Sequence, residues 1–268
     1  MTLDEKYQRL IKSISSLGSA AVAFSGGVDS SFLCYAAKAA LGQKAIAITI
    51  VSPLLPRSEI ASAEEVARLV GIEHILIKEE DLDAQVAANP KDRCYHCKKL
   101  EFGKILRAAK ERGITAVLDG SNTDDMGDYR PGLKALEELR ITSPLREAGM
   151  AKADIRELSR RFGLPTWDKP AFACLASRIP YGETIDKKKL ARVEKAEEVL
   201  SAYGFRQLRV RLHGNIARIE VAPDERKLFF NEKTLDAISR DLKSCGFLYA
   251  AFELEGYTVG SLNQEIKK

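Results

Sequence analysis

The segment Ser25-Gly26-Gly27-Val28-Asp29-Ser30 combines residue types that bind phosphate groups. Its adjacent glycines can adopt backbone angles that turn consecutive N–H groups toward an anion, and Ser25 and Ser30 add hydroxyl donors. The carboxylate of Asp29 would repel bare phosphate, so its presence predicts a bridging Mg²⁺ ion. We therefore expect a site for the phosphate groups of a nucleotide, in which Asp29 is a catalytic residue. The alternative is a turn in which the glycines serve backbone geometry alone.

A second polar segment, Asp119-Gly120-Ser121-Asn122-Thr123-Asp124-Asp125, follows an apolar run that is expected to form a strand. Asn122 and Asp125 offer amide and carboxylate oxygens, which suit Mg²⁺ or a nucleotide. A polar loop that caps a helix N-terminus would use the same residue types. The residues alone leave both interpretations open.

Three cysteines have a spacing or context that suits a metal. Cys94 and Cys97 lie three positions apart, which lets both sulfurs reach one ion, and Cys174 lies further along the chain. Three thiolates without a fourth suit a [4Fe–4S] cluster with one open iron. His96 would instead complete a zinc site of three cysteines and one histidine, and a redox pair or coincidence also explains an isolated C-x-x-C.

Apolar runs alternate with amphipathic segments over the N-terminal part of the chain, which predicts alternating strands and helices. The expected strands are 20–24, 45–51, 74–77 and 116–119, and the expected helices include 1–17, 30–41, 59–70, 98–112 and 152–161. This alternation predicts an α/β fold, a parallel twisted sheet with helices on both faces. The phosphate-binding segment then lies at the carboxyl edge of the sheet, where open α/β sheets bind ligands.

The pattern changes after about Pro170. A long charged helix is expected at 185–203, a half-exposed antiparallel hairpin at 208–212 and 216–221, a helix at 232–245 and a strand at 247–255. We therefore divide the chain into an N-terminal domain, 1–170, and a smaller α+β domain, 171–268. Arg209 and Arg211 share one face of a strand and could meet a phosphate together, although a solvated strand face is the alternative.

The composition is that of an ordinary globular protein, with 45% apolar and 30% charged residues. The formal charge of +4 permits anionic substrates, but a dedicated nucleic-acid binder would carry a denser basic stripe. We find neither a membrane-spanning run nor a signal peptide pattern, and we expect a cytoplasmic location. The odd number of cysteines argues against a disulfide framework, and Cys34 and Cys245 lie in apolar contexts that predict burial.

The hexapeptide at residues 25–30 resembles the PP-loop of ATP pyrophosphatases, the superfamily of GMP synthetase, NAD synthetase, asparagine synthetase and tRNA thiolases. The resemblance implies that ATP is cleaved between its α and β phosphates, that AMP is transferred to a substrate oxygen, and that the loop holds the released pyrophosphate. Adenylation activates a carboxylate because an acyl-adenylate has a good leaving group. Residues 119–125 resemble the second nucleotide-side segment of the superfamily.

Three further stretches, 128–132, 169–182 and 208–221, resemble the LarE family of sulfur transferases, which build the nickel-pincer nucleotide cofactor of lactate racemase. The resemblance covers nearly the whole chain. It implies that the protein adenylates a pyridinium dicarboxylate mononucleotide with ATP and replaces AMP with sulfur, which leaves a thiocarboxylate. In members with a single cysteine, the residue that matches Cys174 gives up its own sulfur and becomes dehydroalanine.

The resemblance implies a different sulfur source for members that also carry the C-x-x-C, namely an external sulfide delivered by a [4Fe–4S] cluster. This chain belongs with those members, so Cys94, Cys97 and Cys174 are expected to ligate the cluster. The implied contacts to the mononucleotide come from Ser177, Arg178, Arg209 and Arg211. Relatives form trimer-based hexamers, in which the candidate metal ligands at subunit contacts are Glu197 or Glu198 and Glu220.

Two other functions fit parts of the sequence. A tRNA thiolase of the same superfamily usually brings an RNA-binding domain or zinc ribbons with further C-x-x-C pairs, and this chain has a single C-x-x-C. A zinc- and nucleotide-binding regulator without catalysis would bind ATP but release no pyrophosphate.

Overall fold

The structure is a computed structural model that describes residues 1–127, 131–170, 173–258 and 261. The chain forms two compact units, residues 1–81 with 92–172 and residues 82–91 with 173–268. Asp128, Tyr129 and Arg130 of one family-like motif, and Ala171 and Phe172 of another, lie outside the described residues.

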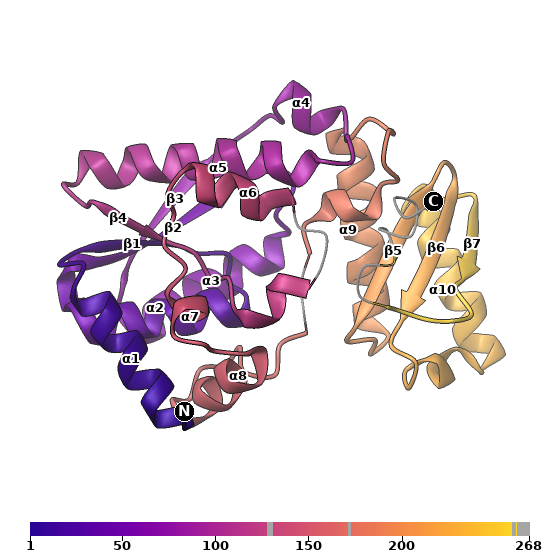
Figure 1. Cartoon of the computed structure of the whole chain (residues 1–268). Coiled ribbons are helices and arrows are strands. Elements are labelled where there is room, and N and C mark those ends of the chain that lie inside the picture. Colours follow the sequence, from indigo (N-terminus) through magenta and orange to yellow (C-terminus); the bar gives the residue numbers. More distant parts are fainter. Residues whose placement is uncertain (128–130, 171–172, 259–260, 262–268) are drawn as a thin grey trace. The chain divides into compact units, whose positions relative to one another are not determined.

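The first unit contains a four-stranded parallel sheet in the order β3-β2-β1-β4, with helices on both faces (Figure 1). Its strands are β1 (Ala20–Ala23), β2 (Ala45–Val51), β3 (Glu73–Lys78) and β4 (Ala116–Leu118). Its helices are α1 (Leu3–Ser15), α2 (Val28–Leu41), η1 (Gly42–Lys44), α3 (Arg57–Val70), α5 (Arg93–Glu111), η2 (Thr123–Gly127), α6 (Pro131–Glu138), α7 (Pro144–Glu147) and α8 (Lys152–Arg161). The predicted α/β class is confirmed.

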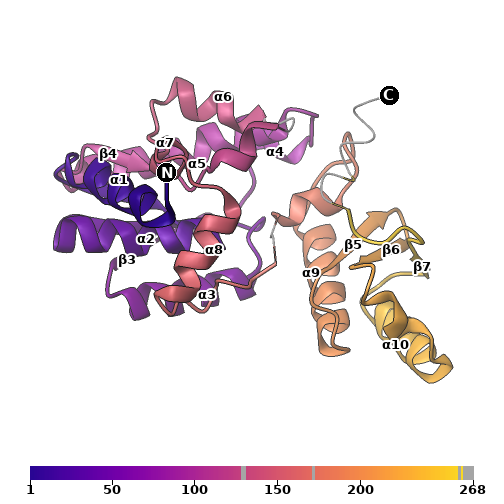
Figure 2. The same ribbon diagram turned by 60° about the horizontal axis from the view of Figure 1, so that its bottom comes forward.

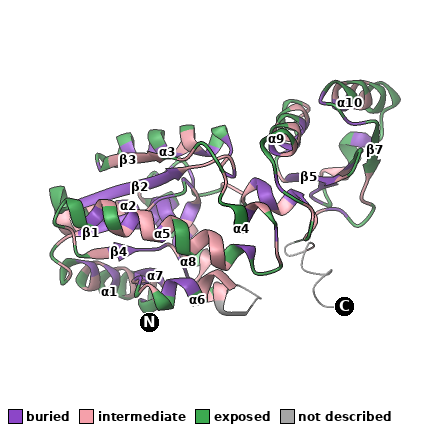
Figure 3. Ribbon diagram, turned by 90° about the horizontal axis from the view of Figure 1, so that it is seen from above, coloured by how far each residue is buried: buried purple, intermediate pink, exposed green. Residues whose placement is uncertain are grey.

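Two hydrophobic cores lie on opposite faces of this sheet. Successive strand residues point to opposite faces, so Ala20 and Val22 of β1 pack with α1, α2, α3 and α8, while Ala21 packs with α5 and α6. Because both faces are covered, β1 and β2 are buried along their length (Figure 3). This burial explains why both strands are continuous apolar runs in the sequence.

The strand order places the two polar segments of the first unit next to each other. β1 lies between β2 and β4, and all three are parallel, so the segments that follow β1 and β4 leave the same edge of the sheet. Their backbones approach closely, since a Cβ atom built on Gly120 would lie 3.2 Å from the amide nitrogen of Ser30. The fold therefore joins residues 25–30 and 119–125 into one site.

The second unit is a small mixed sheet in the order β5-β6-β7, in which β5 and β6 are antiparallel and β6 and β7 are parallel. Helices α9 and α10 contact each other and pack on one face of this sheet (Figure 2). The elements are α4 (Ala84–Ala87), η3 (Leu175–Arg178), α9 (Lys187–Ala202), β5 (Leu208–His213), β6 (Ile216–Val221), η4 (Arg226–Phe229), α10 (Glu232–Ser244) and β7 (Tyr249–Phe252).

Residues 82–91 join the second unit through Asn89, whose side chain is fully buried. Its amide nitrogen lies 3.3, 2.7 and 3.0 Å from the carbonyl oxygens of Ile179, Pro180 and Glu183. Its own carbonyl oxygen accepts the N–H of Gly182 at 2.9 Å. Asn89 also has a positive φ of 56°, a conformation that asparagine tolerates better than most residues.

Cys34 and Cys245 are buried, as their apolar contexts predict. Burial raises the pKa of both thiols, which keeps them protonated and unreactive. Among the described residues, no helix is both long enough and apolar enough to cross a membrane.

Replacing Asn89 tests whether this amide holds the second unit together. Asn89→Gly keeps the positive φ and removes the side chain, so the free energy of unfolding should fall by about 2–4 kcal/mol because buried carbonyl groups lose their donor. Asn231→Ala is the control, since Asn231 is an exposed N-cap whose loss should cost about 1 kcal/mol. Urea denaturation measures both values, and a smaller loss for Asn89→Gly than for the control would contradict the assignment.

Candidate functional site

The segment at residues 25–30 forms the turn between β1 and α2, and its own side chains fix its shape. Ser30 Oγ donates to the carbonyl oxygen of Gly27 at 3.2 Å and accepts the N–H of Ser25 at 3.3 Å. In the described part of the chain, the N–H groups of Gly26 and Gly27 donate to no protein acceptor. Gly27 is the N-cap residue of α2, so these donors stand where the helix dipole favours an anion.

Gly26 and Gly27 make different demands on the backbone. Gly26 has a φ of +74°, and a Cβ atom there would lie 2.8 Å from the carbonyl oxygen of Glu59. Gly27 has a φ of −80°, which any residue adopts, and its Cβ would lie 3.5 Å from Ser25 Oγ, an ordinary contact. The special backbone angles of glycine are therefore needed at Gly26 and not at Gly27, because the left-handed turn and the close approach to α3 both fall on Gly26.

Asp29 lies in the first turn of α2, and its carboxylate contacts Asn122 of the second polar segment and Lys152 of α8. Lys152 Nζ donates to its Oδ2 at 2.6 Å, and Asn122 Nδ2 donates to its Oδ1 at 3.4 Å. Asp125 accepts the N–H of Asn122 at 2.9 Å and so shapes the second segment. The ammonium of Lys152 therefore balances the charge of the Asp29 carboxylate in this structure. Lys152 is not marked by the sequence, because a lysine at the start of a helix carries no spacing signal.

Cys94 and Cys97 lie at the start of α5, and their spacing of three places them on one side of the helix. Cys94 is exposed, whereas Cys97 is half-buried with its Sγ 3.4 Å from Glu101 Oε1. His96 faces Asp92, with 3.2 Å between Nε2 and Oδ2. The described residues contain no group of three or more His, Cys, Asp or Glu side chains placed to hold a metal ion.

Cys174 belongs to the second unit, where Arg178 organises its surroundings. Arg178 is fully buried, and its Nη1 donates to the carbonyl oxygens of Ala173 at 2.6 Å and Cys174 at 3.1 Å and to Ser177 Oγ at 2.9 Å. Its Nε and Nη2 form a bidentate pair with Glu197 at 2.8 and 2.9 Å. The guanidinium therefore fixes the backbone that carries Cys174.

Arg209 and Arg211 lie on one face of β5, as their spacing predicts, but that face is buried. Their exposed fractions are 6% and 5%. Arg211 pairs bidentately with buried Glu220 at 3.1 and 2.8 Å and donates to the carbonyl oxygen of Ser177 at 2.6 Å. The expectation of a half-exposed hairpin is therefore wrong, because an acidic partner on β6 lets a charged residue of β5 be buried.

Arg209 is held by contacts of another kind. Its guanidinium lies over the ring of Tyr257, 5.0 Å from the centroid, and Nη1 donates to the carbonyl oxygen of Leu208 at 2.6 Å. Burial lowers the pKa of Arg209, and the nearby charge of Arg178 lowers it further. A bound anion would offset both effects, which makes Arg209, rather than the already paired Arg211, the candidate contact for a phosphate group.

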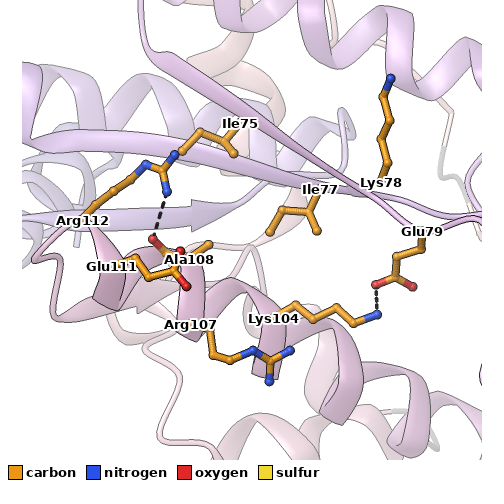
Figure 4. Close-up of a pocket in the computed structure, with 9 residues that line it drawn as sticks. All are labelled: Ile75, Ile77, Lys78, Glu79, Lys104, Arg107, Ala108, Glu111 and Arg112. Carbon is orange, nitrogen blue, oxygen red and sulfur yellow. Dashed lines mark hydrogen bonds and ion pairs between the residues drawn. The ribbon is translucent and has the colours of Figure 1, made fainter.

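A surface groove of about 410 Å³ lies between β3 and α5 and contains no predicted site residue (Figure 4). It is lined by Ile75, Ile77, Lys78, Glu79, Lys104, Arg107, Ala108, Glu111 and Arg112. Lys104 forms an ion pair with Glu79 across it. The residues predicted to bind nucleotide therefore lie outside this groove.

Comparison with known proteins defines the class of the first unit. The asparagine synthase family model matches residues 12–167, a span that includes the β1–α2 turn, Asn122 and Lys152. The tRNA-specific 2-thiouridylase of Xanthobacter autotrophicus is 30% identical over 217 residues, which covers 66% of this chain and 55% of that protein. The first unit is therefore a PP-loop domain of the ATP pyrophosphatase superfamily.

Two relatives match the chain over its whole length. An uncharacterized protein of Synechocystis sp. is 41% identical over 267 residues, 99% of this chain and 100% of that protein. The pyridinium-3,5-bisthiocarboxylic acid mononucleotide synthase of Lactiplantibacillus plantarum is 36% identical over 272 residues, 100% of this chain and 97% of that protein. The chain belongs to the LarE family of ATP-dependent sulfurtransferases.

The two glycines of the loop give a direct test of the site geometry. Gly26→Ala should lower pyrophosphate release from ATP by about tenfold or more, because its Cβ forces the loop away from α3. Gly27→Ala should lose clearly less, since its backbone angles and surroundings accept a methyl group. Steady-state assays of pyrophosphate release measure both, with circular dichroism as the check on folding. A larger loss for Gly27→Ala would show that the loop geometry is different.

Proposed function

We propose that the protein uses ATP to adenylate the carboxylate of a pyridinium dicarboxylate mononucleotide and then replaces AMP with sulfur, which gives a thiocarboxylate for a nickel-pincer nucleotide cofactor. The observation that carries the proposal is the β1–α2 turn, where the N–H groups of Gly26 and Gly27 have no protein acceptor among the described residues and Asp29 follows in the first turn of α2. The substrate class rests on the full-length match to the mononucleotide synthase.

The first step forms an acyl-adenylate. An oxygen of the substrate carboxylate attacks the α-phosphorus of ATP, the bond to the bridging oxygen of the β-phosphate breaks, and pyrophosphate leaves with that electron pair. The N–H groups of Gly26 and Gly27 and the N-terminus of α2 hold the departing phosphates. Asp29 and Asn122 would hold Mg²⁺, which neutralises phosphate charge when bound.

The second step exchanges oxygen for sulfur at the activated carbon. A hydrosulfide ion attacks the acyl carbon, the bond to the AMP oxygen breaks, and AMP leaves with the electron pair while the sulfur loses its proton to water. The thiocarboxylate therefore forms without any change in oxidation state. We propose an external sulfide donor, because Cys94 and Cys97 have no part in a mechanism that consumes the sulfur of Cys174.

We propose that Cys94, Cys97 and Cys174 together ligate a [4Fe–4S] cluster. Cys94 and Cys97 lie on one side of α5, which suits two ligands of one group, and Arg178 holds the backbone of Cys174 in a fixed conformation. When bound through three thiolates, such a cluster supplies an open iron at which sulfide is held.

In this proposal, the phosphate group of the substrate binds to the face of β5 that carries Arg209 and Arg211. Arg209 is its main contact, since burial and the charge of Arg178 both favour an anion beside it. Arg211 and Ser177 complete the surroundings, although Arg211 is already paired with Glu220.

We further propose that the chain assembles into a trimer-based hexamer. Large apolar side chains of the second unit are exposed, among them Phe230 at 82% and Leu254 at 76%, and burial between copies would remove them from water. Two of the three candidate interface ligands are already in ion pairs, Glu197 with Arg178 and Glu220 with Arg211. The third, Glu198, is exposed and available to a metal.

Asp29→Asn tests the adenylation step. With ATP, Mg²⁺, sulfide and pyridinium-3,5-dicarboxylic acid mononucleotide, the wild-type protein should release AMP and pyrophosphate in equal amounts and form the thiocarboxylate. Asp29→Asn should slow this release by about a hundredfold or more, because Mg²⁺ loses its proposed carboxylate ligand and no longer neutralises the phosphate charge. Asp236→Asn, at an exposed position on α10, is the control. Unchanged turnover in Asp29→Asn would rule out its role, and a wild type without pyrophosphate release would rule out the function.

The cysteines are tested by iron content and turnover. After anaerobic purification, Cys94→Ser, Cys97→Ser and Cys174→Ser should each lose the iron and the visible absorbance of the cluster, yet still release pyrophosphate. Cys245→Ala, at a thiol outside the proposed cluster, should keep both. A loss of about 34 Da from Cys174 after one turnover, the mass of hydrogen sulfide, would show a sacrificial cysteine instead. Stoichiometric zinc in place of iron would equally contradict the proposal.

A further inference from the structure

The peptide that joins Gly26 to Gly27 is held from outside the loop by a lysine 143 positions away along the chain. Lys169 Nζ donates to the carbonyl oxygen of Gly26 at 3.1 Å. The described residues contain no cis peptide bond, and in a trans peptide the C=O and the following N–H point in opposite directions. Lys169 therefore turns the N–H of Gly27 away from itself, and this is one of the donors without a protein acceptor among the described residues.

The ammonium of Lys169 has a partner for each of its three protons. Besides Gly26, Nζ donates to Glu59 Oε2 and to Ser62 Oγ, both at 2.9 Å. Glu59 is 5% exposed and lies in the first turn of α3, so this bond is charge-assisted and shielded from solvent. A lysine has three donors and no more, so Lys169 as placed here has none left for a phosphate. Its effect on a ligand must act through the peptide that it orients.

The main chain of Lys169 is fixed as well. Arg156 of α8 donates through Nη1 to the carbonyl oxygen of Trp167 at 2.6 Å and through Nη2 to that of Lys169 at 2.7 Å. The N–H of Lys169 donates to the carbonyl oxygen of Thr166 at 3.0 Å. The lysine is therefore anchored at both ends, and its reach to the loop is set by α8.

We infer that Lys169 is a positioning residue for pyrophosphate, the group that leaves in the adenylation step. It locks the Gly26–Gly27 peptide in the orientation that presents the Gly27 N–H to the phosphates, so the loop is preorganised before ATP binds. This inference rests on the proposed function of the loop. AMP carries neither the β nor the γ phosphate, so the effect of Lys169 falls on pyrophosphate and not on AMP.

The test is calorimetric titration of the full chain with pyrophosphate and, separately, with AMP, both in the presence of Mg²⁺. Lys169→Met keeps the length and apolar stem of the side chain but removes its charge. We expect the Kd for pyrophosphate to rise about tenfold and the Kd for AMP to change less than about twofold. Lys44→Met is the matched control, because Lys44 is exposed and precedes β2 at the opposite end of the sheet.

A second variant separates the orienting role from charge balance. Lys169→Met leaves the buried Glu59 carboxylate without its cation, which could distort α3. The double variant Lys169→Met with Glu59→Gln removes that charge while the Gly26 carbonyl still lacks its donor. Pyrophosphate binding should stay weak in the double variant, and thermal unfolding should show it to be folded.

The outcomes distinguish this inference from the proposed function. A wild type that binds no pyrophosphate defeats the function of the loop itself. Wild-type binding of pyrophosphate together with normal binding in Lys169→Met overturns the positioning role alone. Recovery of pyrophosphate binding in the double variant, or an equal loss for AMP, would likewise overturn it, because Lys169 would then serve only to neutralise Glu59 or to stabilise the fold.

Discussion

The close approach between Gly26 and the start of α3 sets the shape of the β1–α2 turn, the loop of residues 25–30. The carbonyl oxygen of Glu59 leaves no room for a Cβ atom at position 26, so α3 limits the loop on that side. The buried strand β1 fixes where the loop begins, and α2 fixes where it ends. The orientation of the backbone donors therefore depends on the packing of three elements. Electrostatic attraction then acts on this preformed geometry, because the N–H donors and the α2 dipole both favour a bound anion.

The second unit uses buried ion pairs for the same purpose. Arg178 with Glu197 and Arg211 with Glu220 are bidentate pairs with little exposure. Such pairs give modest net stability, because their charges lose hydration, but they strongly penalise the loss of one partner. Their value here is geometric, since each guanidinium also holds a backbone carbonyl, that of Cys174 by Arg178 and that of Ser177 by Arg211.

Sequence patterns predicted what local periodicity controls. The strands and helices of the first unit follow their apolar spacing, and residues 25–30 lie at the carboxyl edge of the sheet, as expected. The proximity of residues 119–125 depends on the strand order, which no local pattern marks. The contacts of Lys152 and Lys169 span 123 and 143 positions, so no periodicity or spacing reveals what either lysine contacts, although Lys169 opens the family-like stretch 169–182. Burial of the β5–β6 hairpin escaped prediction for a related reason. The alternation of apolar and charged residues predicts that Arg211 faces solvent. Only the folded structure shows that the carboxylate of Glu220 on β6 takes the place of water as its partner.

The segment 82–91 leaves the first unit, joins the second and returns, so the chain passes between the units after residues 81, 91 and 172. End-to-end fusion of two genes for separate domains produces a single junction and cannot generate this topology. The same path means that one proteolytic cut cannot release a complete second unit. A fragment that starts at residue 173 would lack Asn89, and the carbonyl groups of Ile179, Pro180 and Glu183 would lose their buried donor.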